Sequence, residues 1–178
     1  NITGLLIFVI ATTVYIITSE PTVSFWDCGE YISTAYKLQV GHPPGAPLFQ
    51  MLGRIFSLFA NGNVSLVARM INTMSAIASG LTILFLFWTI TMLGEKIIKI
   101  KGEELNKVNT IIVIGSSIIG SLVYTFSDSF WFSAVEGEVY AMSSFFTAIT
   151  FWSILKWEKI ADQNYNYKWL IFIAFLIG

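Results

Sequence analysis

Residues 26–48 have the sequence WDCGEYISTAYKLQVGHPPGAPL, and they interrupt a chain that is otherwise rich in apolar runs. The stretch holds the single cysteine and the single histidine of the protein, two carboxylates and three of its four prolines. An acidic pair followed by a rigid His-Pro-Pro-Gly turn is more than a chain needs in order to cross a bilayer. We therefore interpret this stretch as a reaction site and the apolar segments as the scaffold that holds it.

The composition indicates an integral membrane protein. Of 178 residues, 55% are hydrophobic and 12% are charged, whereas soluble domains carry about 25% charged residues. The apolar residues form long runs, as membrane-spanning helices do. The formal net charge is −1 and no basic patch with interleaved aromatic residues occurs, so we expect a lipid bilayer and no nucleic acid as partner.

The single cysteine and the chain ends narrow the interpretation further. Cys28 alone cannot form an internal disulfide or a zinc cluster, and we interpret it as a small buried residue. The chain does not begin with methionine and both ends lie in apolar runs, so we expect a fragment of a longer protein. Residues 2–18 are as short as a signal-peptide core, but no small-residue cleavage site follows them, which favours an uncleaved membrane helix.

The apolar runs predict an all-α fold, a polytopic transmembrane helical bundle that forms a single domain over residues 1–178. An external loop is expected over residues 19–63, and the membrane helices are expected near residues 3–18, 64–93, 109–126, 138–155 and 169–178.

The external loop should contain two short interfacial helices. We expect the first over residues 25–38, with Ser24 as its N-cap and Gly41 as its stop. The second should begin at Pro47 and lie in the membrane interface without spanning it. One face of this second helix is a narrow polar stripe at offsets 0, 3, 4 and 7, formed by Gln50, Gly53, Arg54 and Ser57.

Basic residues predict the orientation in the membrane. Seven of the ten lysine and arginine residues lie in two loops on one side, and only Lys37, Arg54 and Arg69 lie on the other. The lysine-rich loops are therefore expected to be cytoplasmic, so that the Asp27 loop and the loop with Glu136 and Glu138 meet on the outer face. If residues 47–60 spanned the membrane, the two acidic loops would lie on opposite sides.

Asp27 and Glu30 are the candidate catalytic residues. They lie three positions apart, so on a helix they share a face. A carboxylate at a membrane boundary can take the proton of an acceptor hydroxyl, or it can ligate a divalent cation. The alternative is the solvated face of a surface helix, although the flanking Phe25, Trp26 and Tyr31 would draw such a helix toward lipid or protein.

His42, Arg69 and Asn72 are candidate substrate-binding residues. The proline turn fixes His42 near the acids, where it contacts substrate or serves as a structural hydrogen-bonding residue. Arg69, with Asn72 close by, suits bidentate binding of phosphate, and the alternative for it is snorkelling to headgroups. A metal site formed by His42, Asp27 and Glu30 has no helical spacing signature, so we expect none, although a divalent cation is compatible with the residue types.

Glu136, Glu138 and Tyr140 form the second candidate substrate-binding cluster. Carboxylates beside aromatic faces suit the binding of sugar rings. Glu138 also lies at the start of a predicted helix, where the helix dipole alone favours an acid.

Four motifs in order carry a resemblance to a known family: WDCGEY (26–31), GHPPGAPL (41–48), ARMINTMSA (68–76) and VEGEVYAM (135–142). Together, across residues 22–144, they resemble the N-terminal membrane region of GT-C-type glycosyltransferases. More closely, they resemble a bacterial family long described as of unknown function, to which a eukaryotic transmembrane protein O-mannosyltransferase also belongs.

The resemblance implies a multi-pass enzyme that moves a mannose-like sugar from a polyprenyl-phosphate donor to a Ser or Thr hydroxyl of a protein acceptor. Asp27 matches the acid of the first external loop in such enzymes. Glu30 departs from their pattern, because many members have two adjacent acids. Some branches use a metal and others do not. The implied location is the bacterial inner membrane, with the active face toward the periplasm.

Two other classes remain open at this level. A non-catalytic membrane scaffold, or a subunit of an envelope translocation complex, would have the same helical pattern. A transporter would also contain charges among apolar helices, but transporter sites usually lie near mid-span, whereas these charges gather at one face.

Overall fold

The computed structural model describes residues 2–43 and 45–177, and every regular element in this part of the chain is a helix. The all-α prediction is therefore confirmed. In chain order the elements are α1 (Ile2–Thr18), α2 (Cys28–Lys37), α3 (Pro47–Leu58), the 3-10 turn η1 (Val64–Leu66), α4 (Val67–Ile100), α5 (Lys107–Thr125), α6 (Asp128–Ala134), α7 (Val139–Glu158) and α8 (Tyr167–Ile177).

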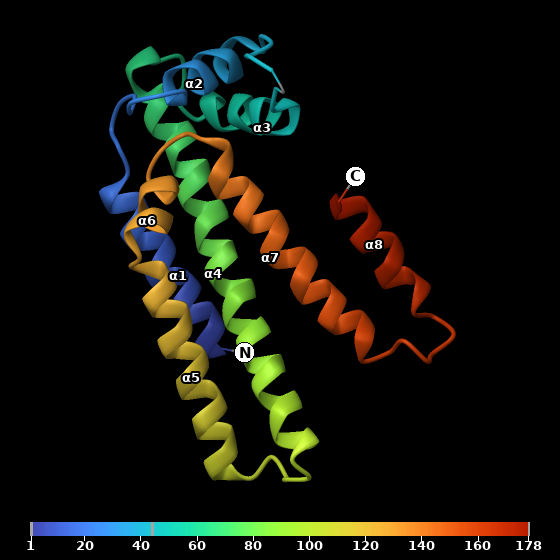
Figure 1. Cartoon of the computed structure of the whole chain (residues 1–178). Coiled ribbons are helices and arrows are strands. Elements are labelled where there is room, and N and C mark those ends of the chain that lie inside the picture. The colour runs from blue at the N-terminus through green and yellow to red at the C-terminus, as the bar shows by residue number, and fades with distance from the viewer. Residues whose placement is uncertain (1, 44, 178) are drawn as a thin grey trace.

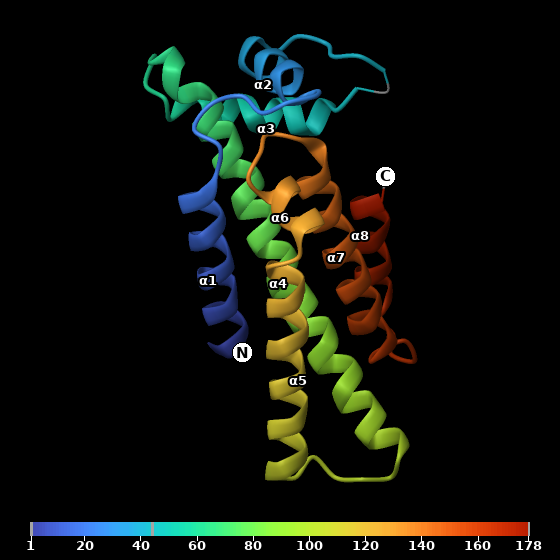
Figure 2. The same cartoon turned by 60° about the vertical axis from the view of Figure 1, so that its left-hand side comes forward.

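The long helix α4 is the centre of the arrangement. It packs against α1, α5 and α7 along its length and against α3 near its start. Helices α2 and α3 lie across one end of the bundle (Figures 1 and 2). We call this end, with residues 135–138, the acidic end. The opposite end, with the turns at residues 101–106 and 159–166, is the lysine end.

Within the residues that the structure describes, two helices are long and apolar enough to cross a membrane. Residues 64–100, which comprise η1 and α4, reach a mean hydropathy of 2.0, and α5 reaches 1.6. Helices α1 and α8 are apolar but have only 17 and 11 residues. Helix α7 has 20 residues but several serines and threonines, and it is not among the two. The bundle of five membrane helices therefore stays a prediction.

Helix α2 is shorter at both ends than the sequence predicts. It begins at Cys28, because Trp26 has a φ of 63° and the chain is not helical there. It ends at Lys37, because Leu38 adopts the left-handed conformation (φ 51°, ψ 48°). The predictions that Ser24 caps this helix and that Gly41 ends it are wrong, since Asp27 and Leu38 occupy those positions.

Helix α3 begins at Pro47 as predicted, and its polar stripe faces the protein. Gln50 Nε2 donates to the Thr34 hydroxyl of α2 (3.2 Å), and Arg54 donates to the Tyr36 carbonyl (2.8 Å). The opposite, apolar face of α3 is exposed. Since α3 lies across the bundle end (Figure 2), it does not reverse the direction of the chain between α1 and α4.

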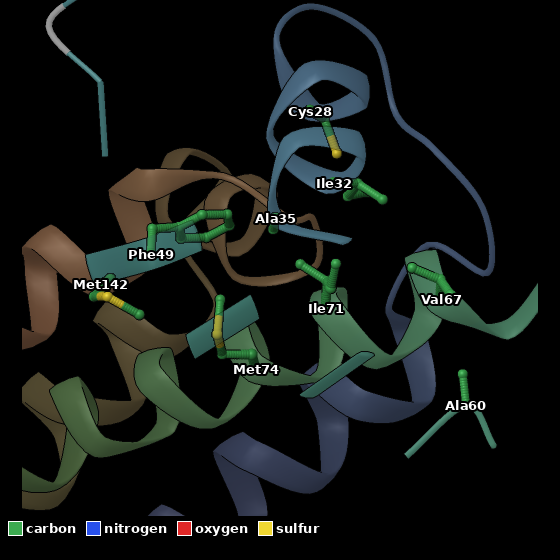
Figure 3. Close-up of a cluster of buried hydrophobic side chains, with 9 residues drawn as sticks. All are labelled: Cys28, Ile32, Ala35, Phe49, Ala60, Val67, Ile71, Met74 and Met142. Carbon is green, nitrogen blue, oxygen red and sulfur yellow. The ribbon is translucent and has the colours of Figure 1, made fainter. Parts of the chain in front are cut away.

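A cluster of buried side chains joins α2 and α3 to the start of α4. In Figure 3 the side chains of Cys28 and Ile32 on α2 lie above the start of α4, where Ile71 and Val67 belong to the same cluster. Ile71 is fully buried in this cluster. The acidic end is thus attached to the bundle by its own apolar core, and the remaining members are Ala35, Phe49, Ala60, Met74 and Met142.

Candidate active site

Asn72, in the second turn of α4, joins the two acidic loops at their base. Its side chain is fully buried, and its Nδ2 donates to the carbonyl oxygens of Glu20 (2.7 Å) and Thr22 (3.0 Å). The N–H of Glu20 in turn donates to the carbonyl of Val135 at 3.0 Å. The start of the external loop is therefore bound to the loop before α7, and the two acidic segments lie at the same end.

Gly137 allows these segments to approach one another closely. A Cβ at this position would lie 2.8 Å from Asn72 Oδ1 and 3.1 Å from Ile32 Cγ1. The pKa of the Cys28 thiol is raised chiefly by burial, and the backbone N–H groups of Ser24 and Gly137 oppose this rise. Cys28 is fully buried, which confirms the prediction of a small buried residue.

Glu30 holds His42 with both carboxylate oxygens. The backbone N–H of His42 donates to Oε1 at 2.5 Å, and His42 Nδ1 lies 3.0 Å from Oε2. These two hydrogen bonds lower the pKa of Glu30, the backbone one more than the side-chain one. The same carboxylate raises the pKa of His42, mainly through the side-chain hydrogen bond. The pair therefore favours a protonated imidazole beside an ionised carboxylate.

Gly41 makes this contact possible. A Cβ on it would lie 3.1 Å from Glu30 Oε1 and 3.3 Å from Gln50 Nε2. Because Gly41 has no side chain, the backbone of the loop after α2 can pass close to both α2 and α3. Gly45, further along the turn, has a φ of 76° and open space around it. Its glycine is required by the backbone conformation and not by close packing.

Asp27 is the carboxylate that remains free. It occupies the N-cap position of α2, but its side chain makes no capping hydrogen bond. The side chain is 60% exposed, and its Oδ2 lies 3.9 Å from His42 Nε2. Within the described residues no group donates a hydrogen bond to this carboxylate. Asp27 and Glu30 therefore differ in environment, because Glu30 is occupied by His42.

Glu136 and Glu138 are buried beside this group, with 2% and 6% of their surface exposed. Burial is the main cause that raises the pKa of both carboxyls, although a hydrogen bond from Ser24 opposes it at Glu136. At Glu138 the negative charges of Glu136 and Asp27 add to the effect. Glu138 is the N-cap residue of α7, but its side chain makes no capping hydrogen bond. A capping role therefore does not explain why a glutamate occupies this position.

Two tyrosines border the site. Tyr140, in the first turn of α7, is 60% exposed. The Tyr31 ring lies 5.9 Å from the His42 ring and 5.5 Å from the Phe49 ring, measured between centroids. The pKa of Tyr31 is raised by burial first and then by its anionic neighbours, Asp27 before Glu138. A carboxylate from each acidic loop therefore affects the pKa of the same tyrosine.

Arg69 and Asn72 are placed differently from the acids. Arg69 is exposed, and its guanidinium forms no hydrogen bond or ion pair with residues 2–43 or 45–177. Asn72 is fully buried and its amide nitrogen is used by two backbone carbonyls. The structure brings Asp27, Glu30, His42, Glu138 and Tyr31 together. The catalytic and substrate-binding roles themselves stay predictions.

The possible use of a divalent cation stays a prediction. In the described part of the chain, no group of three or more His, Cys, Asp or Glu side chains is placed to hold a metal ion. Both oxygens of Glu30 already accept hydrogen bonds from His42. We accordingly derive no reaction step through a metal.

Several residues that shape the site were not among the predicted ones. Gly41 and Gly137 act through the absence of a side chain, and Tyr31 acts through its ring. Tyr31 could have been recognised, because it lies four positions after Asp27 in the predicted helix. The contacts that require the two glycines join segments far apart in the sequence, and no local pattern indicates them.

Residues 27–178 match the family model described as "Protein O-mannosyl-transferase TMEM260 N-terminal domain". The chain is 32% identical over 164 residues to "Protein O-mannosyl-transferase tmem260" of Dictyostelium discoideum, which covers 90% of this chain and 18% of that protein. It is 24% identical over 173 residues to "Protein O-mannosyl-transferase TMEM260" of Mus musculus, which covers 97% of this chain and 22% of that protein.

The chain thus spans about a fifth of the length of these relatives. No solved structure matches it. The family model covers most of the sequence and includes both acidic loops. The chain belongs to the family of protein O-mannosyl-transferase TMEM260 N-terminal domains.

Proposed function

We propose that this chain is the N-terminal part of a GT-C-type membrane glycosyltransferase. The enzyme would move a mannose-like sugar from a polyprenyl-phosphate donor to a Ser or Thr hydroxyl of a protein. The family and the names of the relatives support protein mannosylation as the activity class. The observation that carries the proposal is the exposed Asp27 carboxylate, free of hydrogen bonds in the described chain, beside an imidazole that Glu30 holds in place.

The reaction is a direct displacement at the anomeric carbon. The acceptor hydroxyl oxygen attacks that carbon, the bond from the carbon to the phosphate oxygen breaks, and the polyprenyl phosphate leaves with the bonding electrons. Asp27 takes the hydroxyl proton as general base. Stabilising the charge that develops on the leaving phosphate is the larger contribution, and His42 and Arg69 are the cations available for it.

Glu30 has a positioning role in this scheme. Its two hydrogen bonds fix the His42 backbone and ring and raise the pKa of the ring, which favours its protonated form. Glu136, Glu138 and Tyr140 would hold the sugar. A carboxyl whose pKa is raised keeps its proton to a higher pH, and in that form it can both donate and accept hydrogen bonds with sugar hydroxyls.

We place the acidic end on the non-cytoplasmic face of the membrane. The lysine end then lies in the cytoplasm, as the positive-inside rule predicts from the distribution of lysines. The crosswise course of α3 supports a shared face for the two acidic loops (Figure 1), since α1 and α4 run in opposite directions and, among the described residues between them, no helix runs along the bundle. In a bacterial cell the membrane is the inner membrane and the face is periplasmic.

The test uses the full-length protein in liposomes with a radiolabelled polyprenyl-phosphate mannose and Ser/Thr acceptor peptides. Asp27→Asn should lower transfer by about 100-fold or more, the size of a lost general base. Asp128→Asn is the matched control, because Asp128 is an exposed aspartate in the first turn of α6 at the same end. It should transfer at the wild-type rate.

Each outcome decides between stated alternatives. Loss in Asp27→Asn alone, with equal folding, supports the glycosyltransferase and its base. Equal transfer by both variants would remove Asp27 from the mechanism. Folded protein that transfers nothing from several lipid donors would favour a non-catalytic membrane scaffold, or a subunit of an envelope translocation complex, over the enzyme.

A further inference from the structure

A cavity of about 460 Å³ opens at the lysine end between the last turns of α4 and α7. Its floor is apolar, with Met92 and Leu155 almost fully buried. Its rim is charged and carries Lys96, Lys99 and Lys159 together with two glutamates. The volume lies in the range of about 300–1,000 Å³ that is usual for small-molecule sites. The last turns of α4 and α7, which line the cavity, lie at the opposite end of the bundle from α2 and α3 (Figure 1).

Two ion pairs join the ends of α4 and α7 at the cavity rim. In one pair the lysine comes from α4, and in the other it comes from the C-terminal end of α7. Lys96 of α4 pairs with Glu158 of α7, and Lys159 Nζ lies 3.7 Å from Glu95 Oε2. The pairs brace the two helix ends. They also neutralise two of the three lysines, and among the described residues Lys99 has no carboxylate in ion-pair distance. The cavity therefore combines an apolar floor with one uncompensated positive charge at its rim.

We propose that this cavity binds the phosphate-bearing headgroup of an anionic phospholipid from the cytoplasmic leaflet, with Lys99 as the phosphate contact. Basic pockets between membrane helices on the cytoplasmic side suit anionic headgroups. The apolar floor is suited to the first carbons of the acyl chains. The proposal rests on the membrane orientation given under the proposed function, but it does not depend on sugar transfer.

A simpler explanation of the lysines makes a different prediction. Helices α4 and α7 both end here, and cations are favoured near helix C-termini. If that were the only role of Lys99, its replacement would lower the thermal stability slightly and leave lipid binding unchanged. A phosphate contact requires the reverse, a lost affinity at nearly constant stability.

The experiment measures lipid binding to the full-length protein by native mass spectrometry in detergent. The probes are phosphatidylglycerol, zwitterionic phosphatidylcholine, and inorganic phosphate as competitor. Lys99→Gln should weaken phosphatidylglycerol binding about fivefold, since one surface lysine contributes about 1 kcal/mol toward anionic lipid. Lys107→Gln is the control, because Lys107 is an exposed lysine at the same end, at the start of α5.

The proposal is supported if wild type and Lys107→Gln bind phosphatidylglycerol equally and better than phosphatidylcholine, and Lys99→Gln does not. Equal weakening by both variants would show a general charge effect and overturn the site. An unchanged Lys99→Gln would also overturn it. Displacement by millimolar phosphate would make the free anion the ligand instead of the lipid. Sugar transfer, assayed on the same preparations, reports the proposed function independently.

Discussion

Replacing Gly137 by alanine should open the contact between the two acidic loops. The added Cβ would lie 2.8 Å from Asn72 Oδ1 and 3.1 Å from Ile32 Cγ1. Carbon and oxygen atoms do not approach so closely without a shift of one partner. The Asn72 amide is held by two carbonyls, and Ile32 is buried among the side chains of the α2–α4 core, so neither partner can move aside freely.

The magnitude follows from this confinement. Overpacking a well-packed interior costs about 1–3 kcal/mol, and the fixed partners of Gly137 place it in the upper half of that range. A cost of about 2–3 kcal/mol corresponds to a rise of about 30- to 150-fold in the fraction of molecules in which α2 has separated from residues 136–138.

Cys28 reports this opening directly. It is fully buried among the side chains that join α2 to the start of α4. A thiol reagent can reach it only when α2 separates. The rate of Cys28 alkylation, read by peptide mass spectrometry, should therefore rise by the factor given above in Gly137→Ala.

Gly115→Ala is the matched control. No atom lies within 4 Å of the Cβ position of Gly115, which lies in α5. Alanine there should stabilise the helix by about 0.5–1 kcal/mol and leave Cys28 alkylation unchanged. Equal alkylation rates in Gly137→Ala and wild type would refute the account of a close contact at Gly137.

Three further predictions concern the same end of the molecule. Asn72→Leu leaves the Glu20 and Thr22 carbonyls without their donor and should cost about 2–4 kcal/mol, seen as a lower Tm; an unchanged Tm would contradict it. The pKa of His42 is raised by Glu30, so at low pH the protonated His42 binds Glu30 and keeps residues 39–43 in place. This stabilisation is lost as pH rises above about 6.5 and through the raised pKa. Proteolysis of this segment should increase over that window, and Glu30→Gln should abolish the pH dependence. Because burial raises the pKa of Glu138, its ionisation costs stability as pH rises above about 4.3. The Tm of Glu138→Gln should thus exceed that of wild type at about pH 7.5 and not at about pH 4, and equal differences at both pH values would exclude this cause.

The helices were predictable where their signals are local. Apolar runs indicated α1, α4, α5, α7 and α8, and Pro47 marked the start of α3 because a proline at the first helical position loses no hydrogen bond. The short helix α6 was not predicted. Its seven residues are too few to show the apolar periodicity of a helix, and they lie in a segment rich in aromatic residues. Helix α4 continues to Ile100, seven residues beyond its predicted end, because charged residues after Leu93 do not interrupt a helix.

The site was predictable in its residue types but not in its division of roles. The sequence places Asp27 and Glu30 on one helix and gives no reason to separate them. His42 contacts Glu30 only after the loop has folded back over α2. This contact requires a glycine at position 41, because a side chain there would crowd the Glu30 carboxylate. Similarly, Glu138 is buried next to Gly137, which packs closely against Asn72 and against Ile32 of α2. No pattern within residues 135–142 indicates these contacts.

The length of α4 has a mechanical consequence. Its 34 residues extend about 51 Å, whereas the hydrocarbon core of a bilayer is about 30 Å thick. In the orientation proposed above, this single helix is longer than the hydrocarbon core is thick, with Asn72 near its acidic end and Lys99 near its lysine end. In a thinner bilayer such a helix tilts more, and in a thicker one it stands more upright. The tilt displaces both ends at once, so a change in membrane thickness that moves the acidic end also moves the lysine end.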